Sequence, residues 1–336
     1  DHLIKEYDME QLIKDIAKVE LHCHLDGSVS VELIKQLGAE QGIDINEQHL
    51  QADKDCENLE TYLKCFDEVQ KVLQTKDSLR RSVIDVAEQA TQDNVKYIEL
   101  RFAPLFHMEQ GLAVEEVIAA VILGAEQAMA QLDIKINLLI CAMRQHDIAT
   151  NSELFDRVIA LNSDLVCGID FAGPEAAFPP EDIAPAIQYG LDQGLNLTLH
   201  AGECGCMHNV VESIKLGAQR IGHGVAINNN DELLNMVKTH DVLLEICPQS
   251  NMQTKAIESF KELNLPQLIE QQVPFIINTD NRTVTQTTLN DEYVILYEHE
   301  QLTLEQMKMI NKQAVNYAFL TDADKDVLQA RLEPVK

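Results

Sequence analysis

Two histidines separated by one residue lie in an apolar run near the start of the chain, in the segment VELHCHLDG at residues 19–27. In a β-strand, residues i and i+2 point to the same face, so His22 and His24 are expected to direct two imidazoles toward one point. Neutral imidazole is a common ligand of zinc and other transition metals. The segment therefore predicts part of a metal site. The alternative is a pair of surface histidines that alternate by chance.

Other side chains of metal-binding type follow apolar runs further along the chain. His200 ends one such run, Asp280 follows another, and His223 lies between two glycines. In a barrel of parallel strands, the C-terminal ends of the strands meet at one mouth. We therefore expect these three residues to lie beside His22 and His24.

Three histidines and one carboxylate suit zinc or a similar divalent ion, with one position left for water. Such an ion lowers the pKa of bound water to roughly 7. Attack on a carbon centre also needs a proton donor, and Glu203, three residues after His200, is expected to be that acid. His223 is expected to act as a base or to hold the hydroxide. The alternative is that His223 is a fourth metal ligand.

Eight short runs rich in Val, Ile and Leu alternate with longer segments of helical spacing. The runs are residues 19–25, 95–102, 136–143, 165–171, 195–200, 220–223, 242–247 and 274–279. Most are apolar on both faces, as buried parallel strands are. Asp77 is expected to precede a helix at 78–91, and Thr150 with Glu153 to form a capping box before a helix at 154–161. Eight strands, each followed by a helix, predict an α/β fold, a (β/α)8 TIM barrel.

The connection between the first two predicted strands is oversized, roughly 69 residues from Asp26 to Asn94. A segment after the first strand of a barrel lies over the C-terminal mouth, and loops of this size usually carry function. Within it, Leu59, Tyr62, Leu63 and Phe66 recur at i, i+3, i+4 and i+7, which defines one apolar face of a helix. We expect a long helical insertion that covers the mouth. The helix is either a lid over a substrate or a part of the core.

Composition narrows the class of protein. The chain has 336 residues, of which 46% are hydrophobic and 24% charged, and no linker, repeat or low-complexity tract divides it, so we expect one domain over residues 1–336. Its net charge of −29 argues against nucleic acid as a partner. The longest apolar stretch, 117–125, is far too short to cross a membrane, so no membrane partner is expected. Composition indicates no oligomeric state.

The eight cysteines are irregularly spaced, and four of them fall in the strand-like runs: Cys23, Cys141, Cys167 and Cys247. Such residues behave as small hydrophobic side chains rather than as a disulfide framework. We expect reduced thiols and a cytoplasmic protein.

Four segments carry the chemical pattern in a fixed order, at residues 19–27, 200–203, 222–224 and 278–280. Together they resemble the adenosine deaminases of the amidohydrolase superfamily, and the resemblance covers essentially the whole chain. It implies a (β/α)8 barrel that binds one zinc ion per chain. The implied ligands are His22, His24, His200 and Asp280.

The resemblance also implies a reaction. Glu203 would protonate N1 of a purine as water adds to C6, while His223 and Asp280 orient that water. Ammonia then leaves, so adenosine becomes inosine and 2′-deoxyadenosine becomes 2′-deoxyinosine, a step of purine salvage. The implied partner is a small-molecule nucleoside.

Substrate contacts follow from the same resemblance. Asp26 matches the family aspartate that contacts a ribose hydroxyl, and Gly173 matches the glycine whose backbone N–H meets purine N3. His24 is expected beside the substrate as well as the metal. The segment that gates the pocket corresponds to three residues of this chain, Leu59, Tyr62 and Leu63.

The chain departs from the family pattern after the eighth strand. Many members have two adjacent aspartates there, and the second hydrogen-bonds purine N7. Here the second residue is Asn281. Since N7 is an acceptor, an aspartate must be protonated to donate to it, whereas an asparagine amide donates without that requirement.

Other functions stay open at this point. A deaminase of adenine or of another adenosine-like, N6-substituted purine would use the same chemistry. An AMP-type substrate would call for Arg or Lys near Asp26, and the segment 26–31 contains none. A two-metal hydrolase of the same superfamily would be expected to have a lysine after the fourth strand, where residues 170–172 have none. A non-enzymatic relative would be expected to lack a ligand or Glu203, and none is missing.

Overall fold

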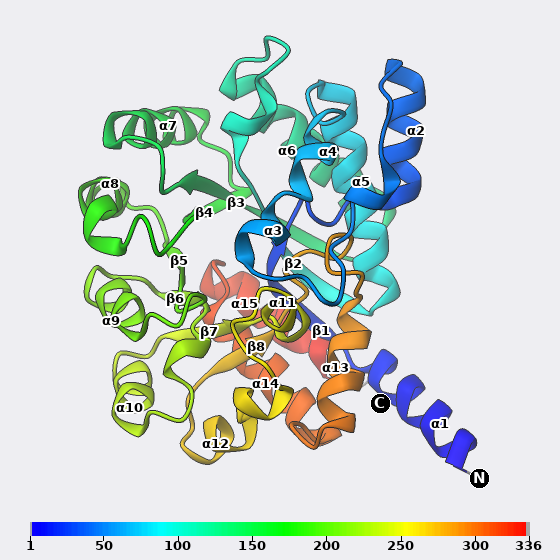
Figure 1. Cartoon of the computed structure of the whole chain (residues 1–336), viewed down its shortest axis with the longest axis vertical. Helices are drawn as coiled ribbons and strands as arrows, with labels where there is room; N and C mark the ends of the chain where they lie inside the picture. The colour runs from blue at the N-terminus through cyan, green and yellow to red at the C-terminus, as the bar shows by residue number, and fades with distance from the viewer. Residues whose placement is uncertain (1, 334–336) are drawn as a thin grey trace.

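The computed structural model describes residues 2–333 and contains the predicted eight strands (Figure 1). These are β1 (Lys18–His24), β2 (Val95–Phe102), β3 (Lys135–Met143), β4 (Val166–Ala172), β5 (Thr198–Ala201), β6 (Arg220–His223), β7 (Leu243–Ile246) and β8 (Phe275–Ile277). All neighbouring strands pair in parallel, as β1-β2-β3-β4 and β5-β6-β7-β8. Parallel bridges Cys23–Asp280 and Ile169–Leu197 link the two sheets. The predicted (β/α)8 barrel is confirmed.

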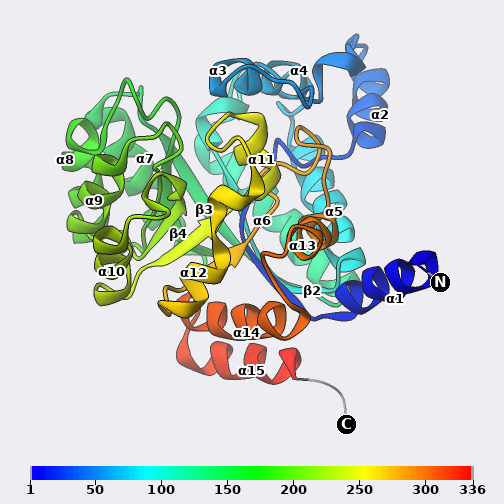
Figure 2. The same cartoon turned by 60° about the horizontal axis from the view of Figure 1, so that its bottom comes forward.

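Helices surround the strands. They are α1 (His2–Asp15), α2 (Val31–Gln41), α3 (Leu59–Leu63), α4 (Phe66–Gln70), α5 (Lys76–Gln92), α6 (Val114–Gln131), α7 (Ile148–Leu161), α8 (Pro180–Asp192), α9 (Met207–Lys215), α10 (Asp231–Thr239), α11 (Pro248–Gln253), α12 (Leu265–Glu270), α13 (Leu289–Glu298), α14 (Leu304–Ala314) and α15 (Asp322–Leu332). Five short 3-10 turns complete the structure: η1 (Glu47–His49), η2 (Pro104–His107), η3 (Val225–Ile227), η4 (Phe260–Leu263) and η5 (Val315–Tyr317). Figure 2 shows α3 and α4 at one end of the barrel and α14 and α15 at the other.

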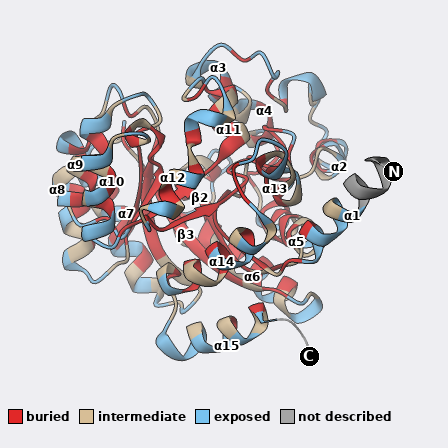
Figure 3. Ribbon diagram, turned by 90° about the horizontal axis from the view of Figure 1, so that it is seen from below, coloured by how far each residue is buried: buried red, intermediate tan, exposed pale blue. Residues whose placement is uncertain are grey.

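The core occupies the strands and the inward faces of the surrounding helices (Figure 3). Strand residues are buried on both faces, as the continuous apolar runs predict; in β2, seven of eight are buried. Since a parallel strand packs against helices outside and against other strands inside, neither face is left for water.

The barrel interior nevertheless carries charge. Five fully buried residues project from its strands: Glu99, Arg101, Asp170, Arg220 and Glu245. Arg101 pairs with Asp170 at 2.9 Å and with Glu245 at 3.1 Å, and Arg220 pairs with Glu99 and Glu245 at 2.6 Å each. Removal of one partner would leave an uncompensated buried charge, which is strongly destabilising.

Two predicted helix starts are wrong, the first by two residues and the second by six. α5 begins at Lys76 because the Thr75 hydroxyl, rather than Asp77, caps it and accepts from Ser78 N at 3.1 Å. α7 begins at Ile148, capped by the Asp147 carboxylate, which accepts from Thr150 N at 2.7 Å. In both cases an earlier side chain with an oxygen acceptor reaches the free N–H groups of the first turn.

The insertion after β1 covers the mouth of the barrel, but its apolar residues 59–66 do not lie on one continuous helix. The single helix expected from residue 59 onward is two short helices, α3 and α4, separated by Lys64 and Cys65. Tyr62 is buried in a small cluster with Cys56 and Val284 that is separate from the main core. The segment therefore packs on the loop after β8 rather than inside the barrel, which favours the lid interpretation.

Two sequence expectations about the whole chain can be compared with the described residues. All eight cysteines are unpaired, as expected. Across residues 2–333, every helix is too short or too polar to cross a bilayer.

Candidate active site

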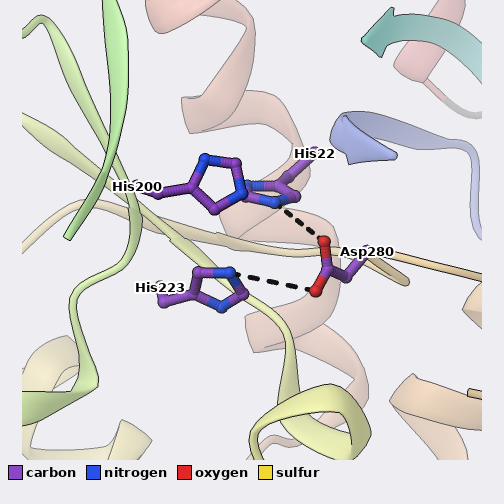
Figure 4. Close-up of side chains that lie close together, drawn as sticks. All are labelled: His22, His200, His223 and Asp280. Atoms are coloured by element: carbon purple, nitrogen blue, oxygen red, sulfur yellow. Dashed lines mark ion pairs between the residues drawn. The ribbon is translucent and has the colours of Figure 1, made fainter. Parts of the chain in front are cut away.

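The ends of four strands bring the candidate metal residues together. His22 and His24 end β1, His200 lies in β5, His223 ends β6, and Asp280 follows β8. Figure 4 shows the side chains of His22, His200, His223 and Asp280 turned toward one another, and one ligand atom of each lies within 4.8 Å of those of the others. The barrel thus assembles residues that are more than 250 positions apart in sequence.

The two oxygens of Asp280 face different groups. Oδ1 lies 3.0 Å from His22 Nε2 and 3.2 Å from His24 Nε2, and His24 Nε2 lies 3.3 Å from His200 Nε2. Oδ2 accepts from the Ser250 hydroxyl at 2.7 Å and lies 3.8 Å from His223 Nε2. Three imidazole nitrogens therefore gather near Oδ1, while His223 lies on the Oδ2 side.

The atoms at this centre fit a divalent metal ion. His22 Nε2 and Asp280 Oδ1 are buried and face each other at 3.0 Å, but neither has a hydrogen-bond partner of regular geometry, although buried polar atoms are normally paired. Burial lowers the pKa of His200 to about 3 and also lowers the pKa of His22, so both imidazoles are neutral. Burial opposes ionisation of Asp280, but the surrounding imidazoles of His22, His24 and His223 together outweigh burial and hold the pKa of that carboxyl well below its usual value. Neutral imidazoles and a carboxylate are ligands that zinc-like ions prefer.

Two buried carboxylates hold the rings in place. Glu245 Oε1 lies 2.9 Å from His22 Nδ1, and Asp170 Oδ2 lies 2.8 Å from His200 Nδ1. Such contacts fix the tautomer that leaves Nε2 free for a metal. Sequence reasoning missed this function of both residues. The available signal was a carboxylate inside an apolar strand run.

Glu203 and His223 form a second pair beside the centre. His223 Nε2 lies 3.3 Å from Glu203 Oε2. Burial raises the pKa of Glu203 to about 7, so its carboxyl group holds a proton near neutral pH. Glu175, which sequence reasoning did not single out, accepts from Gly202 N at 2.6 Å and from Glu203 N at 3.2 Å. These bonds fix the backbone that carries the acid.

The backbone is strained at two of these residues. His223 has φ +72° and Asp280 has φ +64°, in the left-handed region that non-glycine residues seldom adopt. Such strain concentrates at functional sites. Gly222, next to His223, lies very close to the His22 ring, since an added Cβ would lie 2.8 Å from His22 Cε1. The His22 ring therefore packs directly on the glycine backbone.

A cavity of about 610 Å³ opens above the centre, a size typical of small-molecule sites. It is lined by every residue expected to bind substrate: His24, Asp26, Leu59, Tyr62, Leu63, Gly173 and Asn281. Glu203, His223 and Asp280 also line it. The expected substrate and catalytic residues thus share one enclosed space.

Sequence reasoning missed two glutamines of the cavity, Gln70, which is bonded to Asp26, and Gln145, which lies close to Gly173. Gln70 from α4 donates to Asp26 Oδ2 at 2.7 Å, while Oδ1 accepts from Gly27 N at 2.9 Å. Gly173 has φ +105°, and a Cβ there would lie 2.6 Å from Gln145 Oε1. Only the folded chain brings these glutamines to the cavity, so spacing alone carried no signal for them.

The charge of the cavity is mainly negative. Asp26, Asp67 and Glu109 line it together with the residues of the centre. Among the described lining residues, Lys71 is the one lysine or arginine, and its ammonium group is bonded to Glu68 Oε1 at 2.7 Å. The cavity therefore offers no unpaired cation of this kind to a phosphate group.

A (β/α)8 barrel with a buried His/Asp metal centre at its C-terminal mouth defines the class of metal-dependent amidohydrolase barrels. Within this class the comparison is specific: the family model described as adenosine deaminase matches residues 17–335. The chain belongs to the adenosine deaminase family.

Curated relatives and solved structures agree with this membership. The chain is 39% identical to an adenosine deaminase of Enterococcus faecalis, covering 96% of this chain and 98% of that one. It is 41% identical to an adenosine deaminase of Lacticaseibacillus casei, covering 96% and 97%. The crystal structure of the Arabidopsis N6-mAMP deaminase superposes with a TM-score of 0.86 at 27% identity, covering 96% and 99%.

The metal centre predicts a measurable effect on stability. Chelation of the bound ion should lower the melting temperature by about 5 °C or more, because an ion that binds only the folded state stabilises it. Differential scanning fluorimetry of metal-loaded and chelator-treated protein measures this shift. Chelator saturated with metal beforehand is the control. An unchanged melting temperature after measured loss of the ion would contradict a buried centre of this kind.

Proposed function

We propose that this protein is a zinc-dependent adenosine deaminase that converts adenosine and 2′-deoxyadenosine to inosine and 2′-deoxyinosine plus ammonia, a step of purine salvage. The observation that carries the proposal is the placement of Glu203 and His223 beside the His/Asp centre, at the wall of the cavity that Asp26 and Gly173 also line. A proton donor, a base and a metal centre thus line one cavity, where they can act on the same substrate.

The proposed ligands of one zinc ion per chain are His22, His24, His200 and Asp280. The three imidazole nitrogens near Asp280 Oδ1 support this set. His223 is proposed as the base instead, since its Nε2 faces Glu203 and Asp280 Oδ2. When bound, the ion lowers the pKa of a water so that hydroxide is available near neutral pH.

Proton transfers by the chain complete the reaction. Glu203 donates its proton to N1 of the purine as the water oxygen bonds to C6, and His223 takes the proton that the water loses. His223 then protonates the amino group, the C6–N6 bond breaks, and ammonia leaves. Glu203 recovers a proton from the new C6 hydroxyl, which becomes the carbonyl of inosine. Both residues return to their starting states.

Substrate recognition is assigned to groups around the cavity. Asp26, oriented by Gln70, accepts from a ribose hydroxyl, and the Gly173 N–H donates to purine N3. Asn281 donates to N7. Leu59 and Leu63 of α3 close the cavity over the bound nucleoside, and Leu63 is still 38% exposed.

Charge favours a nucleoside over a nucleotide. The carboxylates of Asp26, Asp67 and Glu109 repel a 5′-phosphate, and the Lys71 ammonium is already paired with Glu68. The alternative is an adenine deaminase or a deaminase of an N6-substituted purine, and the Arabidopsis relative of known structure is described as an N6-mAMP deaminase.

The remaining expectations are kept as proposals. One domain spans residues 1–336, and one main hydrophobic cluster with members from Ile13 to Leu332 supports this. Cytoplasmic localisation is supported by the eight unpaired cysteines. No nucleic-acid or membrane partner is proposed, in keeping with the charge of −29.

A substrate panel tests the assignment. Metal-loaded protein is assayed for ammonia release from adenosine, 2′-deoxyadenosine, adenine and AMP, and for methylamine release from N6-methyl-AMP. We expect the two nucleosides to have the highest kcat/KM, because only they combine the ribose contact at Asp26 with the absence of a phosphate. Preference for adenine or for either nucleotide would overturn the assignment.

A further inference from the structure

Asn281 lies in the cavity wall beside a tyrosine that comes from the lid helix α3. Its Nδ2 donates a hydrogen bond of 2.8 Å to the Tyr62 hydroxyl, and that hydroxyl lies 2.7 Å from Thr285 Oγ1. All three residues are only 2% exposed. The three side chains therefore form one buried chain of hydrogen bonds at the edge of the cavity.

The bond to Tyr62 places the nitrogen side of the Asn281 amide. The phenol oxygen accepts from Asn281 Nδ2, and either hydroxyl of the Tyr62–Thr285 pair can be the donor of the second bond. The amide nitrogen has a second N–H, for which the described residues provide no acceptor. The amide oxygen lies on the other side, against the Gly27 backbone, where an added Cβ would lie 1.9 Å from Oδ1.

We propose that Tyr62 is a positioning residue that holds the amide nitrogen of Asn281 in place, so that its second N–H is presented to an acceptor on the bound ligand. This inference rests on the proposed function, in which that acceptor is purine N7. If the amide were reversed, Oδ1 would face N7 and two acceptors would repel each other. Because an amide donates without being protonated, the pair supplies this donor at any pH at which the protein is folded.

The same hydroxyl joins the lid to the loop after β8. Tyr62 packs on Val284 in the small lid cluster, and Ala52 N donates to Val284 O at 2.8 Å. Asn281, Val284 and Thr285 all belong to this loop. The pair of residues that we propose for recognition of N7 is therefore assembled only when α3 packs on the loop after β8.

The variant Tyr62→Phe keeps the ring and removes the hydroxyl. We expect kcat/KM for adenosine to fall about tenfold, because the amide of Asn281 is then free to turn and its hydrogen bond to N7 is lost. The inhibition constant of 7-deazaadenosine, which has C–H in place of N7, should be unchanged. Asn281→Ala should show the same selectivity.

A second pair of variants separates positioning from packing. Thr285→Ser keeps the hydroxyl that is bonded to Tyr62 and should retain wild-type kcat/KM, whereas Thr285→Val should lose activity on adenosine. Equal losses on adenosine and 7-deazaadenosine in Tyr62→Phe, or identical behaviour of the two Thr285 variants, would overturn the inference. Failure of the wild-type protein to deaminate adenosine would instead overturn the proposed function.

Discussion

Replacement of Glu203 by glutamine should reduce kcat for adenosine by about 10²–10⁴-fold, the usual contribution of a positioned proton donor. The glutamine amide has the same shape but cannot give a proton to N1 and recover it. Glu203 holds no proposed ligand position, so the variant should bind its metal ion as the wild type does. Steady-state kinetics and metal analysis of the same preparation measure both quantities.

The exposed Glu232 in α10 provides the matched control, because Glu232→Gln makes the same chemical change far from the cavity. Its kcat should equal that of the wild type. A fully active Glu203→Gln would show that another group protonates the purine. A variant that loses its metal would show that Glu203 acts on the centre itself.

Replacement of His24 by alanine should abolish metal binding and activity together. Substitutions beyond the ligands already cost about 10–100-fold in metal affinity or activity, and loss of a ligand should cost more. The His24 side chain is 16% exposed at the cavity, so its removal should leave the core folded. Metal content by elemental analysis, activity, and circular dichroism as a check of folding test this prediction.

His240→Ala, at an exposed position after α10, is the control and should keep full metal and full activity. The same assay resolves the role of His223. If His223 is the base, His223→Ala should be inactive yet retain its metal ion. Loss of metal from His223→Ala with retention by His24→Ala would reverse the two assignments.

Sequence predicted the strands well because the physics that forms them is local. A strand buried on both faces is mostly apolar, and the runs at β2 and β6 match the observed bounds although both strands carry buried charged residues. The site could be predicted because barrel topology brings strand ends together. His22 and Asp280 are therefore neighbours without any local signal that links them.

The missed features depend on long-range placement. Glu245 and Asp170 support the histidines because alternate strand residues point into the barrel. In the sequence they are visible only as carboxylates inside apolar runs, which does not show which histidine each one contacts. Gln70 reaches Asp26 through the fold of the insertion. The lid was expected as one helix because its apolar spacing continues to Phe66, but the chain forms two short helices, α3 and α4, and Tyr62 packs on Val284.

The central claim is that this barrel uses a bound metal ion to deaminate adenosine. The most direct measurement is the ultraviolet absorbance change of adenosine on addition of metal-loaded protein, with chelator-treated protein and metal-restored protein in parallel. The account predicts conversion to inosine with the loaded protein, none with the chelated protein, and recovery when zinc is returned. Equal conversion before and after the ion is removed, or no conversion by the fully loaded protein, would contradict it.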